Sequence, residues 1–161
     1  MSFCLPENCK IIEGLSPRIG TTVAMTGDYV SMKNFEKLYI VIHYQGADGV
    51  AETFGVMESP LVSGVGAQAS PALFRIWSDL ACATSDLLVE RTAAASYAIN
   101  AVAANKIVIF EVDPAALTEG YDCVAGYTTS GLAVTETISM LYIGVPRVQS
   151  RVLTSATALT D

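Results

Sequence analysis

The segment from Phe35 to Gln45 constrains the fold more than any other part of the sequence. Its apolar residues recur at every second position, which is the period of a β-strand. One face is aliphatic and aromatic and the other is amphipathic: Leu38, Ile40, Ile42 and Tyr44 against Tyr39, Val41, His43 and Gln45. The turn-forming stretch 46–49 follows, and residues 52–57 resume an extended pattern. These two segments therefore predict a β-hairpin.

A second segment, Lys106–Val112, is apolar at consecutive positions and rich in β-branched residues, which predicts a central strand buried on both faces. Residues 114–117 predict one helical turn that Asp113 caps. Two more strands are predicted at 121–127 and 137–145, and weaker patterns occur at 73–77 and 87–92, whereas 101–106 fits a short helix or a loop. No stretch keeps a helical apolar period beyond one or two turns.

Many short strands between Gly, Asp, Pro and Asn turns are typical of an all-β domain. The length of 161 residues fits one domain. We therefore predict a single antiparallel β-sandwich or barrel with one or two short helical turns and extended arms at both termini. We expect residues 28–145 to form this domain, residues 1–27 to form an N-terminal arm and residues 146–161 to form a C-terminal tail.

The composition indicates either a surface rich in Ser, Thr, Ala and Gly or a surface that other subunits partly cover, and the sequence is compatible with both. Only 16% of the residues are charged while 52% are hydrophobic, so few charges are available to hydrate a monomer. The longest uncharged stretch, 59–74, is broken by Pro and Gly and predicts no membrane span. A net charge of −7 without clustered Lys and Arg argues against nucleic-acid binding. The first residues lack a signal-peptide pattern, so we expect synthesis in the cytoplasm.

The residue types used in catalysis form no recognisable pattern. The one histidine, His43, lies inside the strongest predicted strand, and there is no G-x-S-x-G nucleophile motif. Carboxylate pairs such as Asp79 with Asp86, or Glu111 with Asp113, are expected by chance among 16 acidic residues. We therefore expect no enzyme activity, no small-molecule substrate and no cofactor.

The four cysteines suggest neither a metal site nor a redox motif, because there is no C-x-x-C pair and no second histidine. Cys82 and Cys123 are expected to be small core residues. Cys4 and Cys9 lie on the predicted arm, where they could form disulfides between subunits once a particle leaves the cell. The arm is too apolar for a free tail, so we expect it to make ordered contacts through Phe3, Leu5, Ile11, Ile12, Leu15 and Ile19.

Several segments follow one another in a characteristic order: DYVSMKN at 28–34, KLYIVIHYQG at 37–46, IW at 76–77, ATSDLLV at 83–89, NKIVIFEVDP at 105–114, GYDC at 120–123 and ISMLY at 138–142. This series resembles a family of small structural proteins of tailed bacteriophages and prophages. Members often read D-Y-V-S-L-K-N, then a strand ending in V-H and a Q-G turn, then I-W…A-S-D-x-L-V and N-K-I-V-V-F-x-I-D-P. The resemblance covers about residues 28–145, and it brings no catalytic residue with it.

What the resemblance implies is a virion component made in the host cytoplasm, above all a capsid decoration (cement) protein. Such a protein has copies of itself and the major capsid protein as partners, and it stabilises the head by lateral contacts between capsomers. Two other interpretations stay open. A head–tail joining or tail protein belongs to the same class, whereas a β-sandwich that binds carbohydrate or another surface belongs to a different one.

Overall fold

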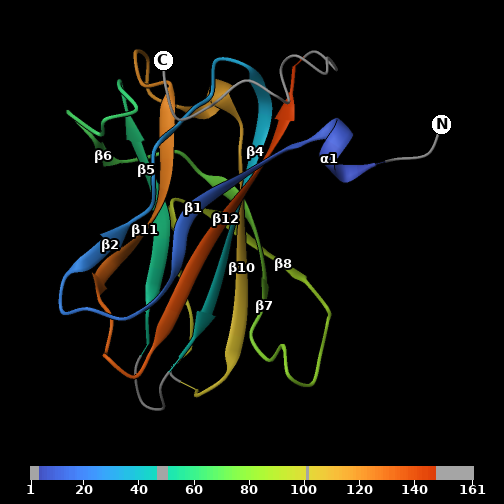
Figure 1. Ribbon diagram of the computed structural model, residues 1–161, viewed down its shortest axis with the longest axis vertical. Helices are drawn as coiled ribbons and strands as arrows, with labels where there is room; N and C mark the ends of the chain where they lie inside the picture. Colours follow the sequence, from blue (N-terminus) through green and yellow to red (C-terminus); the bar gives the residue numbers. More distant parts are fainter. Residues whose placement is uncertain (1–3, 47–50, 101, 148–161) are drawn as a thin grey trace.

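Two antiparallel β-sheets pack face to face in the computed structural model, which describes residues 4–46, 51–100 and 102–147 (Figure 1). The larger, sheet A, has six strands in the spatial order β1 (Lys10–Ile19), β12 (Thr137–Pro146), β4 (Phe35–Gln45), β10 (Asn105–Val112), β7 (Phe74–Asp79) and β8 (Val89–Ala94). Sheet B has the order β2 (Ala24–Thr26), β11 (Cys123–Gly131), β5 (Thr53–Ser59) and β6 (Gln68–Ala69). In addition, β3 (Val30–Ser31) pairs with β11 and β9 (Ser96–Ala98) pairs with β5. The fold is an all-β sandwich, as predicted.

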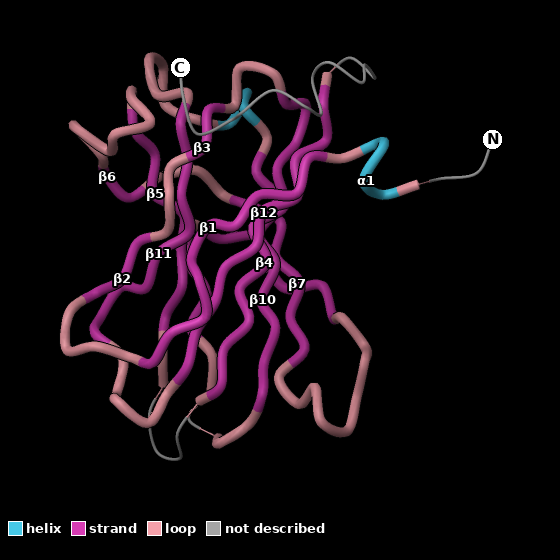
Figure 2. Tube along the Cα trace, viewed as in Figure 1, coloured by secondary structure: helices cyan, strands magenta, loops and turns pink. Residues whose placement is uncertain are grey.

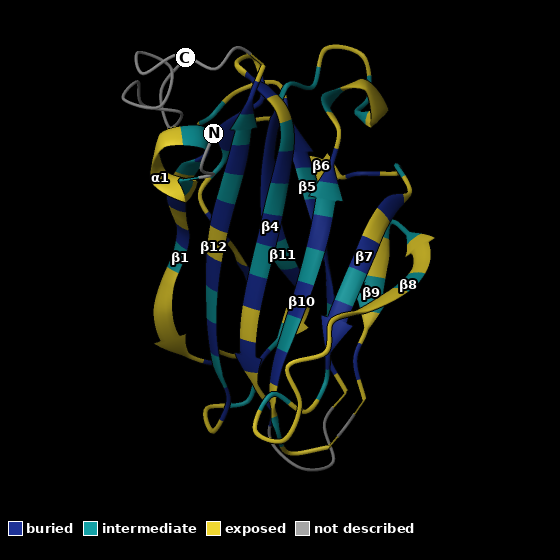
Figure 3. Cartoon of the chain, turned by 90° about the vertical axis from the view of Figure 1, so that its right-hand side faces the viewer, coloured by how far each residue is buried: buried dark blue, intermediate teal, exposed yellow. Residues whose placement is uncertain are grey.

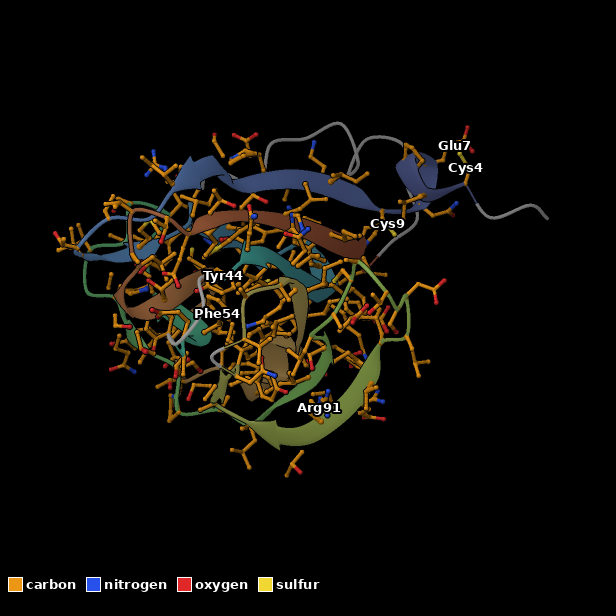
Figure 4. All side chains as sticks on the ribbon, turned by 90° about the horizontal axis from the view of Figure 1, so that it is seen from below. Cys4, Glu7, Cys9, Tyr44, Phe54 and Arg91 are labelled. Carbon is orange, nitrogen blue, oxygen red and sulfur yellow. The ribbon has the colours of Figure 1, made fainter. Side chains whose placement is uncertain are left out.

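Strand β4 is the centre of sheet A and has the bounds predicted from its alternation. Its predicted apolar face is fully buried: Leu38, Ile40, Ile42 and Tyr44. Each such side chain contributes about 1.5–3 kcal/mol when it leaves water. The ring of Tyr44 meets that of Phe54 in β5 edge to face, with centroids 5.3 Å apart (Figure 4), so the alternating face of β4 joins the two sheets.

The sheets approach closely where β11 crosses the centre of the sandwich. A side chain at Gly126 would place its Cβ 2.9 Å from both Ile40 Cγ2 and Met140 Sδ. The backbone N–H of Gly126 donates a hydrogen bond of 3.0 Å to the buried hydroxyl of Tyr142 in β12. Glycine is therefore required here to keep the two sheets in contact.

The predicted hairpin of β4 and β5 is wrong, because the two strands belong to different sheets. Strand β4 pairs with β10 and β12, and β5 pairs with β11, β6 and β9. Residues 47–50 of the expected turn lie outside the described residues, and the strands before and after them belong to sheets that pack roughly 10 Å apart. A turn signal fixes only the change in direction, and strand pairing depends on distant partners.

The remaining local predictions are mostly confirmed, with shifted boundaries. Asp113 caps the 3-10 turn η1 (Pro114–Ala116), accepting a hydrogen bond of 2.9 Å from the N–H of Ala115. Strands predicted from residues 121 and 87 begin two residues later, at Cys123 and Val89. Residue 101 lies outside the described part, 102–104 have no regular structure, and β10 already begins at Asn105.

The N-terminal segment differs from the arm expected for residues 1–27. A single helical turn, α1 (Leu5–Asn8), precedes β1, and β1 pairs with β12 from Lys10 opposite Gly144 to Ile19 opposite Thr137 (Figure 2). Strand β2 joins sheet B. Two register shifts interrupt the β1–β12 pairing, and such bulges break the alternation that identifies a strand in the sequence.

Strand β12 ends at Pro146, where the expected C-terminal tail begins. Arg147 fixes this end through two bonds to the backbone, from its N–H to the carbonyl of Asn34 and from its Nε to the carbonyl of Phe35. Residues 148–161 of the expected tail lie outside the described residues. The helical turns in the described part are too short to cross a membrane.

Candidate assembly surface

The residues considered for catalysis occupy separate structural positions. His43 projects from the outer face of sheet A and is exposed to solvent. Asp79 accepts a hydrogen bond of 2.9 Å from the N–H of a residue in the following loop. Glu111 accepts one of 2.6 Å from a lysine, Asp113 caps η1, and Asp86 is exposed in a loop. The carboxylates considered as acid–base pairs are thus mostly used in local hydrogen bonds.

Within residues 4–46, 51–100 and 102–147, no three His, Cys, Asp or Glu side chains gather to hold a metal ion. All four cysteines are free. Cys123 is buried and Cys82 partly buried, whereas Cys4 and Cys9 flank α1 at the edge of the molecule (Figure 4). Cys4 is partly exposed, but burial raises the pKa of the Cys9 thiol and so lowers its reactivity.

The outer face of sheet A is apolar across four neighbouring strands. The pairing register sets one row from β12 to β7 side by side: Leu141, Val41, Ile109 and Trp77. The adjacent row, from β1 to β4, extends the same apolar field: Ile11, Ile143 and Tyr39. Leu141 is 42% exposed and Ile11 44%, while the other five are partly exposed. Figure 3 views the molecule from this side, with exposed residues in yellow and partly exposed ones in teal. A sheet with one wet face normally carries polar residues there, so this face resembles one that is meant to be covered.

Charged residues border this apolar field on one side and neutralise one another. Lys37 pairs with Glu111 at 2.6 Å, and Arg75 lies 3.9 Å from the same carboxylate and 3.0 Å from that of Glu90. The four side chains form a chain of alternating sign that crosses β4, β10, β7 and β8. Because each charge has a partner within the same chain, the border can be desolvated without leaving an isolated charge.

Two aromatic side chains connect the apolar field to this charged border. The Arg75 guanidinium lies 4.7 Å from the centroid of the Trp77 ring. On the other row, burial and then the nearby Glu111 raise the pKa of Tyr39, which stays neutral at physiological pH. Both rings therefore offer apolar area with one polar edge, the type of side chain enriched in protein interfaces.

The outer face of sheet B combines small buried residues with two larger, partly exposed ones, Met57 and Tyr127. On β11, Cys123 and Ala125 point outward by alternation with the core residue Val124, yet both are fully buried. In the connection between β5 and β6, Gly64 lies so close to Tyr29 that a Cβ would come 2.7 Å from the ring. The middle of β11 is thus buried on its outer side as well, whereas the outward residues of β12, β4, β10 and β7 all keep some exposure.

The predicted arm residues divide between the core and the surface. Ile12 is buried, and Leu15 packs against the core. Leu5, Ile11 and Ile19 are exposed, while Phe3 lies outside the described residues. Since β1 is also the first strand of sheet A, Ile11 is continuous with the apolar field on its outer face.

Buried polar groups hold the end of the sandwich where β4 finishes. The Tyr44 hydroxyl donates to Glu136 Oε1 at 2.5 Å, and Lys106 Nζ donates to the carbonyl of Asn100 at 2.7 Å. Burial lowers the pKa of Lys106, although the charge of Glu136 acts in the opposite direction. The first bond joins β4 to the turn before β12, and the second joins β10 to the segment that follows β9.

Glu58 is a buried polar residue near the end of β5, at the other end of the sandwich from Tyr44, and it also connects separate segments (Figure 1). Its buried carboxylate accepts hydrogen bonds from Gln68 at 2.8 Å, Ser70 at 2.8 Å and the N–H of Thr118 at 3.3 Å. Burial alone would raise the pKa of Glu58, but these hydrogen bonds outweigh it and lower the pKa. One side chain thereby connects β5 to β6 and to the segment after η1.

Sequence reasoning missed the open face of sheet A, although it found its components. The doubly apolar pattern of β10 predicted a strand buried on both sides, and β10 is indeed central between β4 and β7. Its outward residues Ile107 and Ile109 are nevertheless partly exposed. The signal that identifies this face is that β12, β4, β10 and β7 all carry apolar residues at neighbouring outward positions. Which positions are neighbours is known only once the pairing register of the strands is known.

These features define a class: an antiparallel β-sandwich that presents the outer face of its larger sheet as an apolar surface. No protein-family model and no curated protein matches the chain. Among solved structures it is similar to YomS, a protein derived from the SPBc2 prophage, with 13% identity over 84% of this chain and 91% of that one and a TM-score of 0.44. It is also similar to the coat protein of Tobacco streak virus, with 13% identity over 91% of this chain and 93% of that one and a TM-score of 0.28. The neighbours thus include a prophage protein and a virus coat protein, at TM-scores too low to define a common fold.

Proposed function

We propose that this protein is a non-enzymatic structural subunit of a phage virion, specifically a capsid decoration (cement) protein. The observation that carries the proposal is the apolar outer face of sheet A, which the rest of the described chain leaves open. The collinear segments within residues 28–145 that resemble phage structural proteins support it. The partners in this role are other copies of the chain and the major capsid protein, and the protein resides in the virion.

The physical task of a decoration protein suits a small, sparsely charged sandwich. A shell under pressure from packaged DNA is stabilised by many lateral ties between capsomers. A standard protein interface buries about 1,600 Å² in total, and repeating it around symmetry axes gives avidity without any single tight contact. Apolar surface contributes to such contacts at any ionic strength, whereas surface ion pairs are weakened by salt.

The N-terminal segment supplies a second proposed contact. Leu5, Ile11 and Ile19 are exposed along the edge of sheet A, and Phe3 precedes them. Edge strand β1 also has one side without a strand partner among the described residues, so a neighbouring chain can extend the sheet there. In this proposal Ile12 and Leu15 hold β1 on the core while the exposed residues touch the neighbour.

Cys4 is the cysteine best placed for the proposed disulfide between subunits, since it is partly exposed at the N-terminal edge. Cys9 is buried and would have to leave its site beside α1. Intact particles should then show a crosslinked band on non-reducing gels that disappears with reductant. The band should be lost in Cys4→Ser and kept in Cys82→Ser; identical gels with and without reductant contradict the disulfide.

The proposed function is tested with particles assembled with and without this protein. Particles that lack it should form heads of normal size that release DNA at a lower temperature, and adding purified protein should restore the release temperature. A reconstruction should show density on the outer shell between capsomers. Heads of unchanged stability without the protein would refute the decoration role, and density confined to the neck or tail would replace it with a joining role.

A further inference from the structure

We propose that the outer face of sheet A is the contact between two copies of this chain, which pair face to face as a two-fold dimer. The proposal rests on the assembly role above and deepens it by naming one partner of this surface. The N-terminal edge, with Leu5 and Ile19, then remains available for the capsid.

The apolar field has the layout that an isologous contact needs. In such a contact the same patch serves both partners, so it must be complementary to itself. The row from Leu141 through Val41 and Ile109 to Trp77 crosses the middle of the sheet and is formed by branched aliphatic and aromatic side chains. Two such faces pack as the sheets of a β-sandwich do, about 10 Å apart with side chains interdigitating.

The charges around this field favour a second copy over a strongly charged partner. Lys37 and Arg75 balance Glu111 and Glu90 in one chain of ion pairs, so this border carries no net charge. The whole chain has a net charge of −7, which makes other faces of two copies repel each other. This border of sheet A therefore adds no repulsion between two copies, and the negative charge at the other border comes from Glu13 of β1, opposite Leu141.

The available area matches a stable dimer. Sheet A has six strands. Its strands have 6 to 11 residues each, and with a rise of about 3.3 Å per residue and a spacing of about 4.8 Å they cover about 800 Å² in total. A standard interface buries about 800 Å² per partner. The whole outer face, edge strand β1 included, is thus about as large as a stable dimer needs.

The test compares Leu141→Glu with Val134→Glu by sedimentation over a wide range of concentration. Leu141 lies inside the field, whereas Val134 is more exposed and lies in the turn before β12. The unmodified chain and Val134→Glu should sediment as dimers at micromolar concentration. Leu141→Glu buries two unpaired carboxylates per dimer and should weaken association by about 100-fold or more. Circular dichroism should show the same β-sheet spectrum for all three.

Trp77 gives a second readout that needs no substitution, because it is the one tryptophan of the chain. Dilution through the dissociation range should increase acrylamide quenching of its fluorescence. A chain that stays monomeric at high micromolar concentration, or a Leu141→Glu variant that stays dimeric, overturns the pairing. A dimer that binds no capsid keeps the pairing and refutes the virion role, and a monomer that decorates capsids does the reverse.

Discussion

The outer faces of the two sheets differ in the size of their side chains. On sheet B the outward residues Cys123 and Ala125 of β11 are small and fully buried, and the larger Tyr127 follows them on the same face. On sheet A the outward residues are large, and side chains such as Leu141 and Tyr39 remain partly exposed. Outward residues that the same chain buries must be small enough to fit beneath it. Outward residues that another subunit buries must instead offer a large apolar surface. Substitutions should therefore affect folding on sheet B and association on sheet A.

The largest effect is expected from Ala125→Glu, which places an unpaired carboxylate in the buried middle of β11 in sheet B. Burying such a charge without a partner costs about 3–5 kcal/mol, enough to unfold many domains of this size. Urea unfolding followed by circular dichroism measures this loss. Leu141→Glu is the matched change on sheet A, and it should lower the stability of the isolated monomer by less than about 1 kcal/mol. Equal losses at the two positions would remove the distinction between the faces.

Glu58→Ala should lower the free energy of unfolding by about 3 kcal/mol, because three donors lose a buried charged acceptor. The pKa of Glu58 is lower in the folded state than in the unfolded chain. Its contribution is therefore complete above the unfolded pKa of about 4.3 and is lost as the pH falls through the folded pKa.

Unfolding measured against pH tests this sign with Glu58→Gln. That variant should be less stable than the unmodified chain at pH 7, and the difference should shrink under acidic conditions. A difference that stays constant as the pH falls below 4 would show that the charge of Glu58 does not matter (the pH follows from the ordinary glutamate pKa of about 4.3).

Gly64→Ala should destabilise the chain by about 2 kcal/mol, because it combines backbone strain with a steric clash in the connection between β5 and β6. The φ of Gly64 is +74°, and an added Cβ would lie 2.7 Å from the Tyr29 ring. Gly120 is the control, with a φ of +85° and no atom within 4 Å of such a Cβ. Gly120→Ala should cost only the strain, about 1 kcal/mol. If both variants unfold at the same denaturant concentration, the contact with Tyr29 contributes nothing.

The smallest effect on folding is expected from Ile109→Thr, on the open face of sheet A. The substitution keeps a β-branched residue in the strand and should change monomer stability by less than about 1 kcal/mol. It should still weaken self-association, which sedimentation measures. The neighbouring Val108→Thr points into the core, where Val108 is fully buried, and should cost about 2 kcal/mol by burying a hydroxyl. A larger loss for Ile109→Thr than for Val108→Thr would contradict the assignment of the two faces.

The sequence predicts those parts of the fold in which local pattern and tertiary position agree. The alternation of apolar residues predicts the full length of strand β4, and Asp113 followed by Pro114 predicts the helical turn after β10. Strand β1 could not be found in this way, because its register shifts near Leu15 move apolar residues out of phase. The false hairpin has a similar origin, since the choice between two sheets for β5 depends on partners far along the chain.

The candidate surface was predicted even less completely, for a physical reason. The low content of charged residues suggested that part of the surface is covered by other subunits, but composition does not tell which part. The covered surface can be located only from the pairing register, which places Leu141, Val41 and Ile109 side by side on three strands. The same residues read one strand at a time are ordinary core candidates, as the interpretation of β10 showed. Most of the predicted contact residues were placed on the N-terminal segment, and of these only Ile11 lies in the field.

The most direct test of the account is hydroxyl-radical footprinting of the chain at high and at low concentration. Tyr39, Leu141 and Trp77 should be protected from oxidation when the chain is concentrated and should react when it is diluted. Leu73 and Val134, which are exposed outside the apolar field, should react equally at both concentrations. If Tyr39, Leu141 and Trp77 are oxidised at the same rate throughout, the outer face of sheet A is not a surface that a second copy covers.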